Sequence, residues 1–418
     1  MADGIEWRPA DRAAGVNRLS PLRFVMAFGV VSMLADVVYE GARSITGPYL
    51  GTLGASAALV GFVTGAGEAV ALVFRLVTGP LSDRTGRHWA LSIAGYALTV
   101  VSVPLLALAT WLCPAAGLVV AERFGKAVRA PARDTMLAQA AGSGIGRGKA
   151  FAVHEALDQS GALLGPLLVA GMIALSGFRL GFAVLAIPGA LALLALAWLR
   201  RAVPWPVAYE TDHHDAGTTV RADGGLPGRF WLYAAFTATS MAGFATFGVL
   251  SFHLQARHVL PDSLIPVAYA AAMGAAALAA LASGHLYDRI GLRGLVIALP
   301  LSAVVPLLSF STHAGPVWAG AIVWGAAMGI HESTLRAAVA DMVPAARRGT
   351  GYGVFTAVYG LAWLAGSTLI GVLYGHSVTA VVVFTLATQA IALMLFVPLA
   401  FGRPSRRRPR GQPSSSSR

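Results

Sequence analysis

The 418-residue chain contains a single cysteine, Cys113, and few charged residues. One cysteine excludes an intrachain disulfide and a cysteine-rich zinc site. Only 12% of the residues are charged and 56% are apolar, which is outside the range of ordinary soluble domains. The sequence also lacks a glycine-rich loop ending in Lys-Ser or Lys-Thr, the signature of a phosphate-binding loop. These absences indicate an integral membrane protein without disulfide chemistry and without an ATPase site of its own.

The formal net charge of +12 is spread over loops and tails beside apolar runs. Such a distribution indicates membrane topology and argues against nucleic-acid binding. A run of about twenty apolar residues is long enough to cross a bilayer. Twelve such spans are expected, at residues 22–42, 57–79, 89–110, 114–139, 149–175, 179–200, 229–254, 264–287, 293–312, 315–341, 350–375 and 378–401.

Basic residues are concentrated in the even-numbered connections between these spans and in both chain ends. The positive-inside rule therefore predicts a multi-pass protein of the plasma membrane with both termini in the cytoplasm. The longest connection is rich in Pro, Gly, Thr and Asp, which is typical of a boundary between two halves. The expected organisation is a cytoplasmic arm at 1–21, a six-helix bundle at 22–200, a cytoplasmic linker at 201–228, a second six-helix bundle at 229–401 and a basic tail at 402–418.

A polar signature occurs twice in the chain, 205 residues apart. Residues 79–88 read GPLSDRTGRH and residues 284–293 read GHLYDRIGLR. Repetition at half the chain length indicates a duplicated unit. The pattern G-x-L-x-D-R-x-G-R is similar to the loop signature of the major facilitator superfamily (MFS) of secondary transporters, although the second copy lacks the final basic pair. This resemblance, over about residues 20–400, implies an all-α integral membrane fold of twelve helices in two pseudo-symmetric six-helix bundles, with a site between them.

The resemblance also implies that the signature acts as a conformational latch. Asp83 is expected to accept hydrogen bonds from the N-terminus of a neighbouring helix, and Arg84 and Arg87 to pair with Asp134. The residues of the predicted latch are Gly79, Asp83, Arg84, Gly86, Arg87, Asp134, Asp288 and Arg289.

A second motif lies in the fifth predicted span. Residues 161–171 read GALLGPLLVAG and resemble, through Gly161, Gly165 and Pro166, the antiporter motif G-x-x-x-G-P-x-x-G-G of exporters in this superfamily. Val169 and Ala170 stand where that motif has paired glycines. Small residues at every fourth position are also typical of a bent, tightly packed membrane helix. The motif favours export coupled to proton entry over import.

Ionisable side chains inside the predicted spans are candidate functional groups, because a charge in lipid is costly. Buried carboxylates are candidate proton carriers, and these are Asp36, Glu40, Asp158 and Glu332. The fourth span carries a basic stripe that cannot face lipid. The candidate substrate contacts are Arg123, Lys126, Arg129, His154, Glu155, His331 and Arg336. Alternatively, these charges pair with one another and only fix helix packing.

Together these features predict a secondary active transporter that works by alternating access, as a proton-coupled exporter of a drug-like or anionic metabolite. The expected partners are the small solute, protons or another coupling ion, and the lipid bilayer; we expect a monomer with no nucleic acid, no cofactor and no resident metal. An enzyme is disfavoured, because no nucleophile lies with its base. A transporter-like receptor without net transport is an alternative. A carrier of a divalent metal or metal chelate is another, because hard and imidazole ligands are present at Asp36, Glu40, His154, Asp158, His331 and Glu332.

Overall fold

The computed structural model describes residues 17–141, 147–209, 225–344 and 347–401, without the side chains of residues 147–149, 334, 336, 337 and 340. Every regular element in this part of the chain is helical. Eight helices or runs of consecutive helices are long and apolar enough to cross a membrane, and two of these runs, Ala150–Ala202 and Asp262–Ser309, are long enough to cross twice. The more polar α6 (Leu112–Ala141) and α13 (Ala314–Met342) bring the described part of the chain to the twelve crossings that the sequence predicts.

The first half contains the first six crossings. Two of these crossings deviate from a single straight helix: the second is divided into α3 and α4, and α7, which contains the fifth, turns at Gly177, where φ is +74°. A positive φ costs glycine little, so this residue permits the sharp turn between the fifth and sixth crossings. Besides α6, the helices are α2 (Pro21–Thr52), α3 (Ala57–Val73), α4 (Arg75–Thr85), α5 (His88–Leu105), α7 (Arg147–Val184) and α8 (Ala186–Ala202).

The second half contains the remaining six crossings. The seventh is divided into α9 and α10, and the ninth begins as the 3₁₀ helix η4 before it continues as α12. Besides α13, the helices are α9 (Gly228–Ala242), α10 (Phe247–Ala256), α11 (Ile265–Ile290), η4 (Gly291–Ile297), α12 (Ala298–Ser309), α14 (Arg348–His376) and α15 (Val378–Phe401). The short 3₁₀ helices η1 (Leu106–Leu108), η2 (Pro206–Tyr209) and η3 (Asp262–Leu264) lie in connections.

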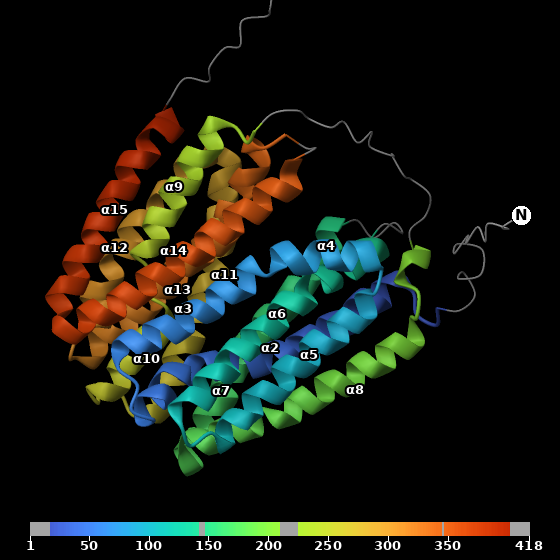
Figure 1. Ribbon diagram of the computed structural model, residues 1–418, viewed down its shortest axis with the longest axis horizontal. Helices are drawn as coiled ribbons and strands as arrows, with labels where there is room; N and C mark the ends of the chain where they lie inside the picture. Colours follow the sequence, from blue (N-terminus) through green and yellow to red (C-terminus); the bar gives the residue numbers. More distant parts are fainter. Residues whose placement is uncertain (1–16, 142–146, 210–224, 345–346, 402–418) are drawn as a thin grey trace, which may run out of the picture.

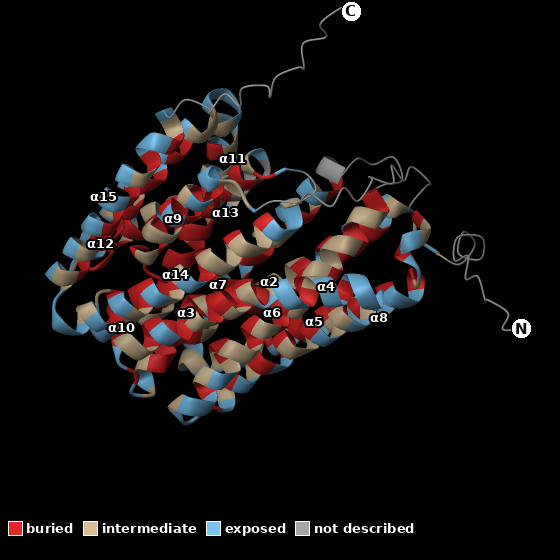
Figure 2. Ribbon diagram, turned by 45° about the horizontal axis from the view of Figure 1, so that its top comes forward, coloured by how far each residue is buried: buried red, intermediate tan, exposed pale blue. Residues whose placement is uncertain are grey.

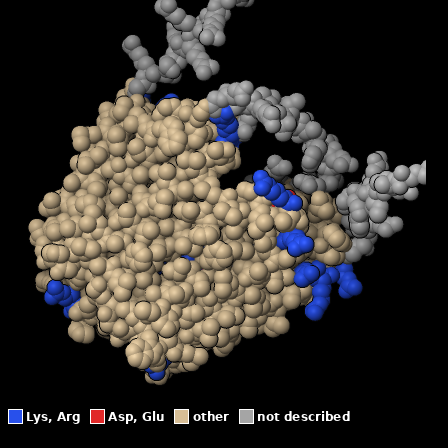
Figure 3. Space-filling view, viewed as in Figure 1, with Lys and Arg blue, Asp and Glu red and all other residues tan. Residues whose placement is uncertain are grey.

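The two bundles meet along three helix pairs, α3 with α14, α2 with α10 and α7 with α11. We call the end of the molecule that holds the two signatures the signature end, and the opposite end the far end. The bundles converge at the far end and separate toward the signature end, so that the molecule has the outline of a V (Figure 1). The space-filling view shows the same notch between the bundles (Figure 3).

Burial follows the expected membrane pattern. Buried residues follow the helix contacts inside each bundle, whereas exposed residues lie on the outer faces (Figure 2). Many of the exposed residues are large and apolar, such as Leu194, Leu278 and Met394, as expected for side chains that face lipid. Figure 3 shows a broad surface with very little charge between groups of Lys and Arg near the margins of the molecule.

The bundles touch most closely at the far end, through glycine. A β-carbon added to Gly61 of α3 would overlap the carbonyl oxygen of Ser367 in α14, and one added to Gly371 would overlap that of Ala57. Small residues at these positions therefore let the two backbones approach directly.

A short chain of buried hydroxyl groups crosses between the bundles at the same level. The Thr64 hydroxyl lies 2.8 Å from that of Thr246, which lies 2.9 Å from that of Ser367. Because all three side chains are buried, these hydrogen bonds satisfy groups that would otherwise be unpaired in an apolar contact.

Several sequence predictions fall outside the described residues. They concern most of the cytoplasmic arm, the central part of the linker and the basic tail. The proposed domain boundaries therefore remain predictions, although the twelve-helix, two-bundle architecture is confirmed.

Candidate functional site

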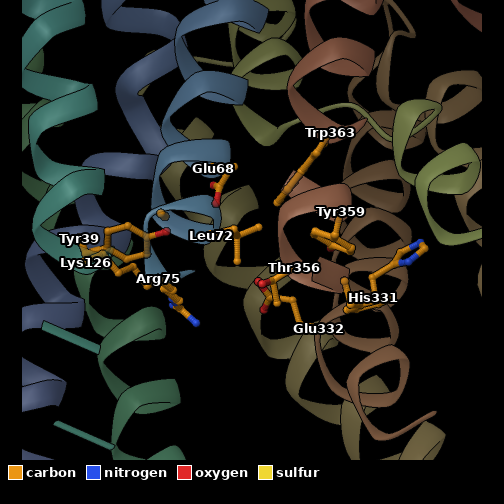
Figure 4. Close-up of a pocket in the computed structure, with 12 residues that line it drawn as sticks. Tyr39, Glu68, Leu72, Arg75, Lys126, His331, Glu332, Thr356, Tyr359 and Trp363 are labelled. Carbon is orange, nitrogen blue, oxygen red and sulfur yellow. The ribbon is translucent and has the colours of Figure 1, made fainter. Parts of the chain in front are cut away.

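A cavity lies between the two bundles (Figure 4). The first bundle contributes Tyr39, Glu68, Ala71, Leu72, Arg75 and Lys126. The second bundle contributes His331, Glu332, Phe355, Thr356, Tyr359 and Trp363. One wall is thus rich in charged side chains and the other in aromatic rings, and Figure 4 shows them facing each other across the space.

Glu68 is the centre of the charged wall. Its Oε1 lies 2.8 Å from Nη2 of Arg43 and 3.3 Å from Nη1 of Arg123. Nε of Arg123 also lies 3.2 Å from the carboxylate of Glu122. All four side chains are buried. These contacts join α2, α3 and α6, and buried ion pairs of this kind are costly to break.

The same guanidinium groups retain unused hydrogen-bond donors. Nη2 of Arg43 and both Nε and Nη1 of Arg123 lie within ion-pair distance of carboxylates, but their N–H bonds make no hydrogen bond to any described group. Buried donors of this kind favour a further acceptor, such as water or an anionic ligand.

The Tyr39 ring contacts two cations at the cavity wall. The Lys126 Nζ lies 3.7 Å from the centroid of the Tyr39 ring, and the Arg123 guanidinium carbon lies 4.3 Å from it. Cation–π attraction therefore helps to hold both cations in place. Lys126 lines the cavity, whereas Arg123 is buried and is not among the residues that line it.

Glu40 connects the charged wall to the second bundle. It accepts a 2.5 Å hydrogen bond from the Tyr269 hydroxyl of α11. The Glu40 carboxylate also lies 3.6 Å from Nη1 of Arg43. The Tyr269 ring packs against Phe247, with 4.6 Å between the ring centroids. A carboxylate of one bundle is thereby held by a hydroxyl of the other.

Asp36 and Arg129 form a separate pair deeper in the first bundle. The Arg129 Nη2 lies 3.4 Å from the Asp36 carboxylate, and its guanidinium carbon lies 4.5 Å from the Tyr96 ring centroid. The Arg129 side chain is 2% exposed, so the described geometry places it among protein groups and not at the cavity. We call the following residues the charge cluster: Asp36, Glu40, Arg43, Glu68, Glu122, Arg123, Lys126 and Arg129.

The aromatic wall is built by successive turns of α14. Tyr359 lies between Phe355 and Trp363, with ring centroids 6.3 and 5.9 Å away respectively. Trp363 also lies 6.4 Å from Phe244 of the seventh crossing. Residues spaced by four share one helix face, so α14 presents a continuous aromatic surface to the cavity.

Glu332 and His331 lie next to each other on α13 but differ in surroundings. Glu332 is exposed within the cavity opening, and no ion pair among the described side chains includes it. His331 is 2% exposed, with its Nε2 3.2 Å from the Ser302 hydroxyl and its ring 5.3 Å from that of Phe244. Its imidazole is therefore packed into the second bundle. The side chain of Arg336, a predicted substrate contact, lies outside the described residues.

Three further predicted residues lie on α7, and one of them, Asp158, contacts α6. Asp158 accepts from Arg133 at 3.3 Å and lies 3.4 Å from Nε2 of the buried His154. Glu155 is exposed and accepts a hydrogen bond from Gln159. None of these three residues lines the cavity described above.

The predicted latch residues are mostly exposed at the signature end. Asp83, Arg84 and Arg87 take part in no ion pair among the described side chains, and Asp134 contacts Arg133 at 3.0 Å. Gly86 has a φ of +62° and ends α4, whereas Gly79 has open space around its α-carbon. The second copy, with Asp288 and Arg289, is also exposed.

One contact near the second signature joins two helices of the same bundle. The Tyr287 hydroxyl donates a 2.6 Å hydrogen bond to Asp341, connecting α11 with α13. The predicted pairing of Arg84 and Arg87 with Asp134 is not formed in this structure, in which the described ion pair of Asp134 is with Arg133.

The glycines of the antiporter-like motif pack α7 against α2. A β-carbon on Gly161 would overlap the carbonyl oxygen of Met33, and one on Gly165 would overlap that of Val37. Pro166 lies next to this contact inside α7. The motif therefore allows close packing of the first and fifth crossings.

Sequence analysis overlooked several residues of the site. Glu68 lies inside the second predicted span, so the cost of a charge in lipid could have identified it. Tyr39, Tyr269 and the α14 rings carry no such signal, because an aromatic residue in a membrane span is unexceptional.

Comparison with known proteins identifies the family. The family model described as Major Facilitator Superfamily matches residues 26–367 and 263–417. An uncharacterized protein of Mycobacterium tuberculosis (strain ATCC 25618 / H37Rv) is 53% identical over 388 residues, which cover 92% of this chain and 95% of that protein. An uncharacterized MFS-type transporter of Methanocaldococcus jannaschii is 28% identical over 148 residues, covering 34% of this chain and 36% of that protein.

Solved structures share the fold at low sequence identity. A nucleoside transporter, NupG, aligns with a TM-score of 0.68 at 16% identity, covering 90% of this chain and 98% of that one. A bacterial homolog of the human lysosomal transporter Spinster, in an inward-facing and unoccupied conformation, aligns with a TM-score of 0.67 at 15% identity, covering 91% and 95%. The sequence match, the two bundles and the cavity between them agree, and the chain belongs to the Major Facilitator Superfamily of membrane transporters.

Proposed function

We propose that this protein exports small organic anions with an apolar part, in exchange for protons, by alternating access. The observation that supports this most is the cavity between the bundles. Lys126 and Arg75 on one wall suit an anionic group, and the rings of Tyr359 and Trp363 on the other suit an apolar or aromatic group. Of the three basic residues of the fourth span that were predicted to contact substrate, we therefore assign this role to Lys126, whereas Arg123 packs against the Tyr39 ring.

The separation of the bundles at the signature end supports an inward-facing state. The positive-inside rule makes this end cytoplasmic. A structural neighbour of the same fold is inward-facing. We infer that both termini are cytoplasmic, that the protein lies in the plasma membrane as a monomer, and that the signature residues engage when the bundles close at this end.

We assign proton coupling to Glu332. It is the carboxylate of the second bundle at the cavity, and no ion pair with a described side chain holds it. By contrast, Asp36, Glu40 and Asp158 are engaged by Arg129, Tyr269 and Arg133 respectively. Each of these three carboxylates holds one helix to another. They are therefore better suited to change the positions of helices when ligand binds than to carry the proton.

Ligand class is tested by thermal shift on the purified protein with organic anions, lipophilic cations, divalent metals and metal chelates. A ligand that binds only the folded state at 100 times its Kd adds about 2.7 kcal/mol to the free energy of unfolding. We expect stabilisation by amphipathic anions that Lys126→Gln removes and Arg200→Gln, an exposed charge change outside the cavity, retains. Stabilisation by cations alone, or an unaltered response of Lys126→Gln, would contradict the assignment.

Coupling is tested by anion uptake into proteoliposomes under an imposed pH gradient. We expect Glu332→Gln to abolish the response to the gradient while substrate binding and exchange of labelled for unlabelled substrate persist. Glu155→Gln, which changes an exposed carboxylate outside the cavity, should respond like the wild type. If Glu332→Gln responded to the pH gradient like the wild type, the proton would have to bind at another residue.

Two alternatives make different predictions in these assays. Among the described residues, no three His, Cys, Asp or Glu side chains come together as a metal site, so the metal alternative is restricted to a negatively charged chelate that the basic wall would bind. A receptor would show saturable binding without uptake. We infer no enzymatic activity, in agreement with the transporter family.

A further inference from the structure

A second cavity lies away from the proposed transport site, on the outer face of the second bundle. It lies between α11, η4 and α12 on one side and α15 on the other. Figure 1 shows α12 and α15 side by side at the outer edge of the molecule. Its walls are apolar, with Ile290, Ile297 and Leu393 each between 44% and 50% exposed. The groove is therefore open to the hydrocarbon of the membrane.

The start of the ninth crossing lines one side of this groove. Residues Gly291–Ile297 form the 3₁₀ helix η4, in which residues three apart lie on one line. Gly294 of this helix lines the groove, and a β-carbon added to it would lie 3.0 Å from the side chain of Leu286, another residue of the groove. Small residues continue the floor at Ala303 of α12 and Ala390 of α15. Glycine and alanine therefore form part of the groove lining between these helices.

Positive charge lies at the signature end of the groove. Arg293 lines the cavity, its Nε donates a 3.3 Å hydrogen bond to the carbonyl oxygen of Ala400, and its guanidinium carbon lies 5.0 Å from the Phe401 ring centroid. Arg289, one turn before it, is exposed. Neither arginine pairs with a carboxylate among the described side chains, so their charge is available to a ligand.

We propose that this groove binds one anionic phospholipid, with an acyl chain between α12 and α15 and the headgroup phosphate at Arg293. The groove has a positively charged side chain at one end of a long apolar channel. This arrangement matches a lipid in which a negatively charged phosphate adjoins a long hydrocarbon chain. Basic pockets between membrane helices on the cytoplasmic side bind anionic headgroups. A free phosphate would leave the apolar channel unfilled.

Native mass spectrometry of the purified full-length protein tests the proposal, with phosphatidylglycerol and phosphatidylcholine of identical acyl chains as probes. We expect one phosphatidylglycerol to remain bound through activation energies that remove phosphatidylcholine. Arg293→Gln should lower the fraction with bound phosphatidylglycerol at least fivefold, to the level of phosphatidylcholine. Arg200→Gln, an exposed arginine at the end of α8 in the first bundle, should leave it unchanged.

The apolar channel is tested independently by Ala390→Phe. Ala390 is exposed, so a ring at this position enters the groove without overpacking the interior. We expect this variant to remain monodisperse and to retain neither lipid. Equal retention of the two lipids by the wild type would overturn the proposal, as would wild-type binding by Ala390→Phe or Arg293→Gln. The readout is lipid mass and not transport, so it does not depend on the proposed transport function.

Discussion

At the scale of single residues, Glu68 has a structural role that extends beyond one ion pair. It contacts Arg43 and Arg123 together, and both guanidinium groups are buried. Removing one partner of a buried pair costs about 3–5 kcal/mol, because a charge is left uncompensated. We expect Glu68→Gln to lower the free energy of unfolding by about that amount, measured by denaturation in detergent.

The matched control is Glu155→Gln. It makes the same chemical change on an exposed helix face, where Glu155 contacts Gln159. Surface changes of this kind stay within about 0.5 kcal/mol. Equal stability losses in both variants would show that Glu68 does not organise the charge cluster.

The hydrogen bond from Tyr269 to Glu40 predicts an effect on conformation. A hydrogen bond to a charged group contributes about 1.5–3 kcal/mol. Because this bond joins the two bundles, Tyr269→Phe should shift the ratio of conformational states by about tenfold or more. The shift can be measured as the distance between spin labels on Thr52→Cys and Arg257→Cys at the far end, with Cys113 replaced by serine.

Tyr287→Phe provides the control for this experiment. It also removes a tyrosine hydroxyl bound to a carboxylate, but Asp341 belongs to the same bundle. We expect the distance distribution of this variant to match that of the parent. If Tyr269→Phe gives the parent distribution as well, the contact with Glu40 does not stabilise the observed state.

The site shows why single residues were only partly predictable. Asp36, Glu40, Lys126 and Glu332 were identified because charge in a membrane span is unusual, whatever its partner. The partner of Glu40 is a tyrosine 229 positions away, and no local pattern connects the two. Likewise, the sequence could not distinguish Lys126, which lines the cavity, from Arg129, which is buried against Asp36.

At the scale of helices, the glycines of α3 and α14 set how closely the bundles approach. A β-carbon at Gly61 would overlap the backbone of Ser367. We expect Gly61→Ala to open the far end, shifting the label distance from Thr52→Cys to Arg257→Cys toward longer values. Gly274→Ala should not, because Gly274 has nothing within contact distance of an added β-carbon. Identical distances in both variants would rule out this contact as a determinant of closure.

Helix number and order were predictable from hydropathy, but several helix ends were not. The first span was expected to end at residue 42, yet α2 continues to Thr52. Arg43 stays inside the helix because Glu68 and Glu40 compensate its charge, which a hydropathy profile cannot register. The division of the seventh crossing into α9 and α10 and the 3₁₀ start of the ninth were also not predicted.

At the scale of the whole molecule, the V-shaped arrangement predicts one-sided access to the cavity. Thr356 lines the cavity, and Cys113 is exposed at the beginning of α6, at the far end. In a Cys113→Ser background, we expect Thr356→Cys to react with a membrane-impermeant maleimide in inside-out vesicles and to react at least tenfold more slowly in right-side-out vesicles. The wild-type thiol at position 113 should show the opposite preference. Equal labelling of Thr356→Cys from both sides would contradict a dominant inward-facing state.

The composition of the charge cluster has an electrical consequence. Its four carboxylates and four cations come from α2, α3 and α6 of one bundle, so with every group ionised the cluster has no net charge. Voltage contributes about 2.3 kcal/mol per elementary charge per 100 mV. The membrane potential would therefore exert little net force on the cluster of the empty carrier, but would act on a bound anion, which an inside-negative potential drives outward.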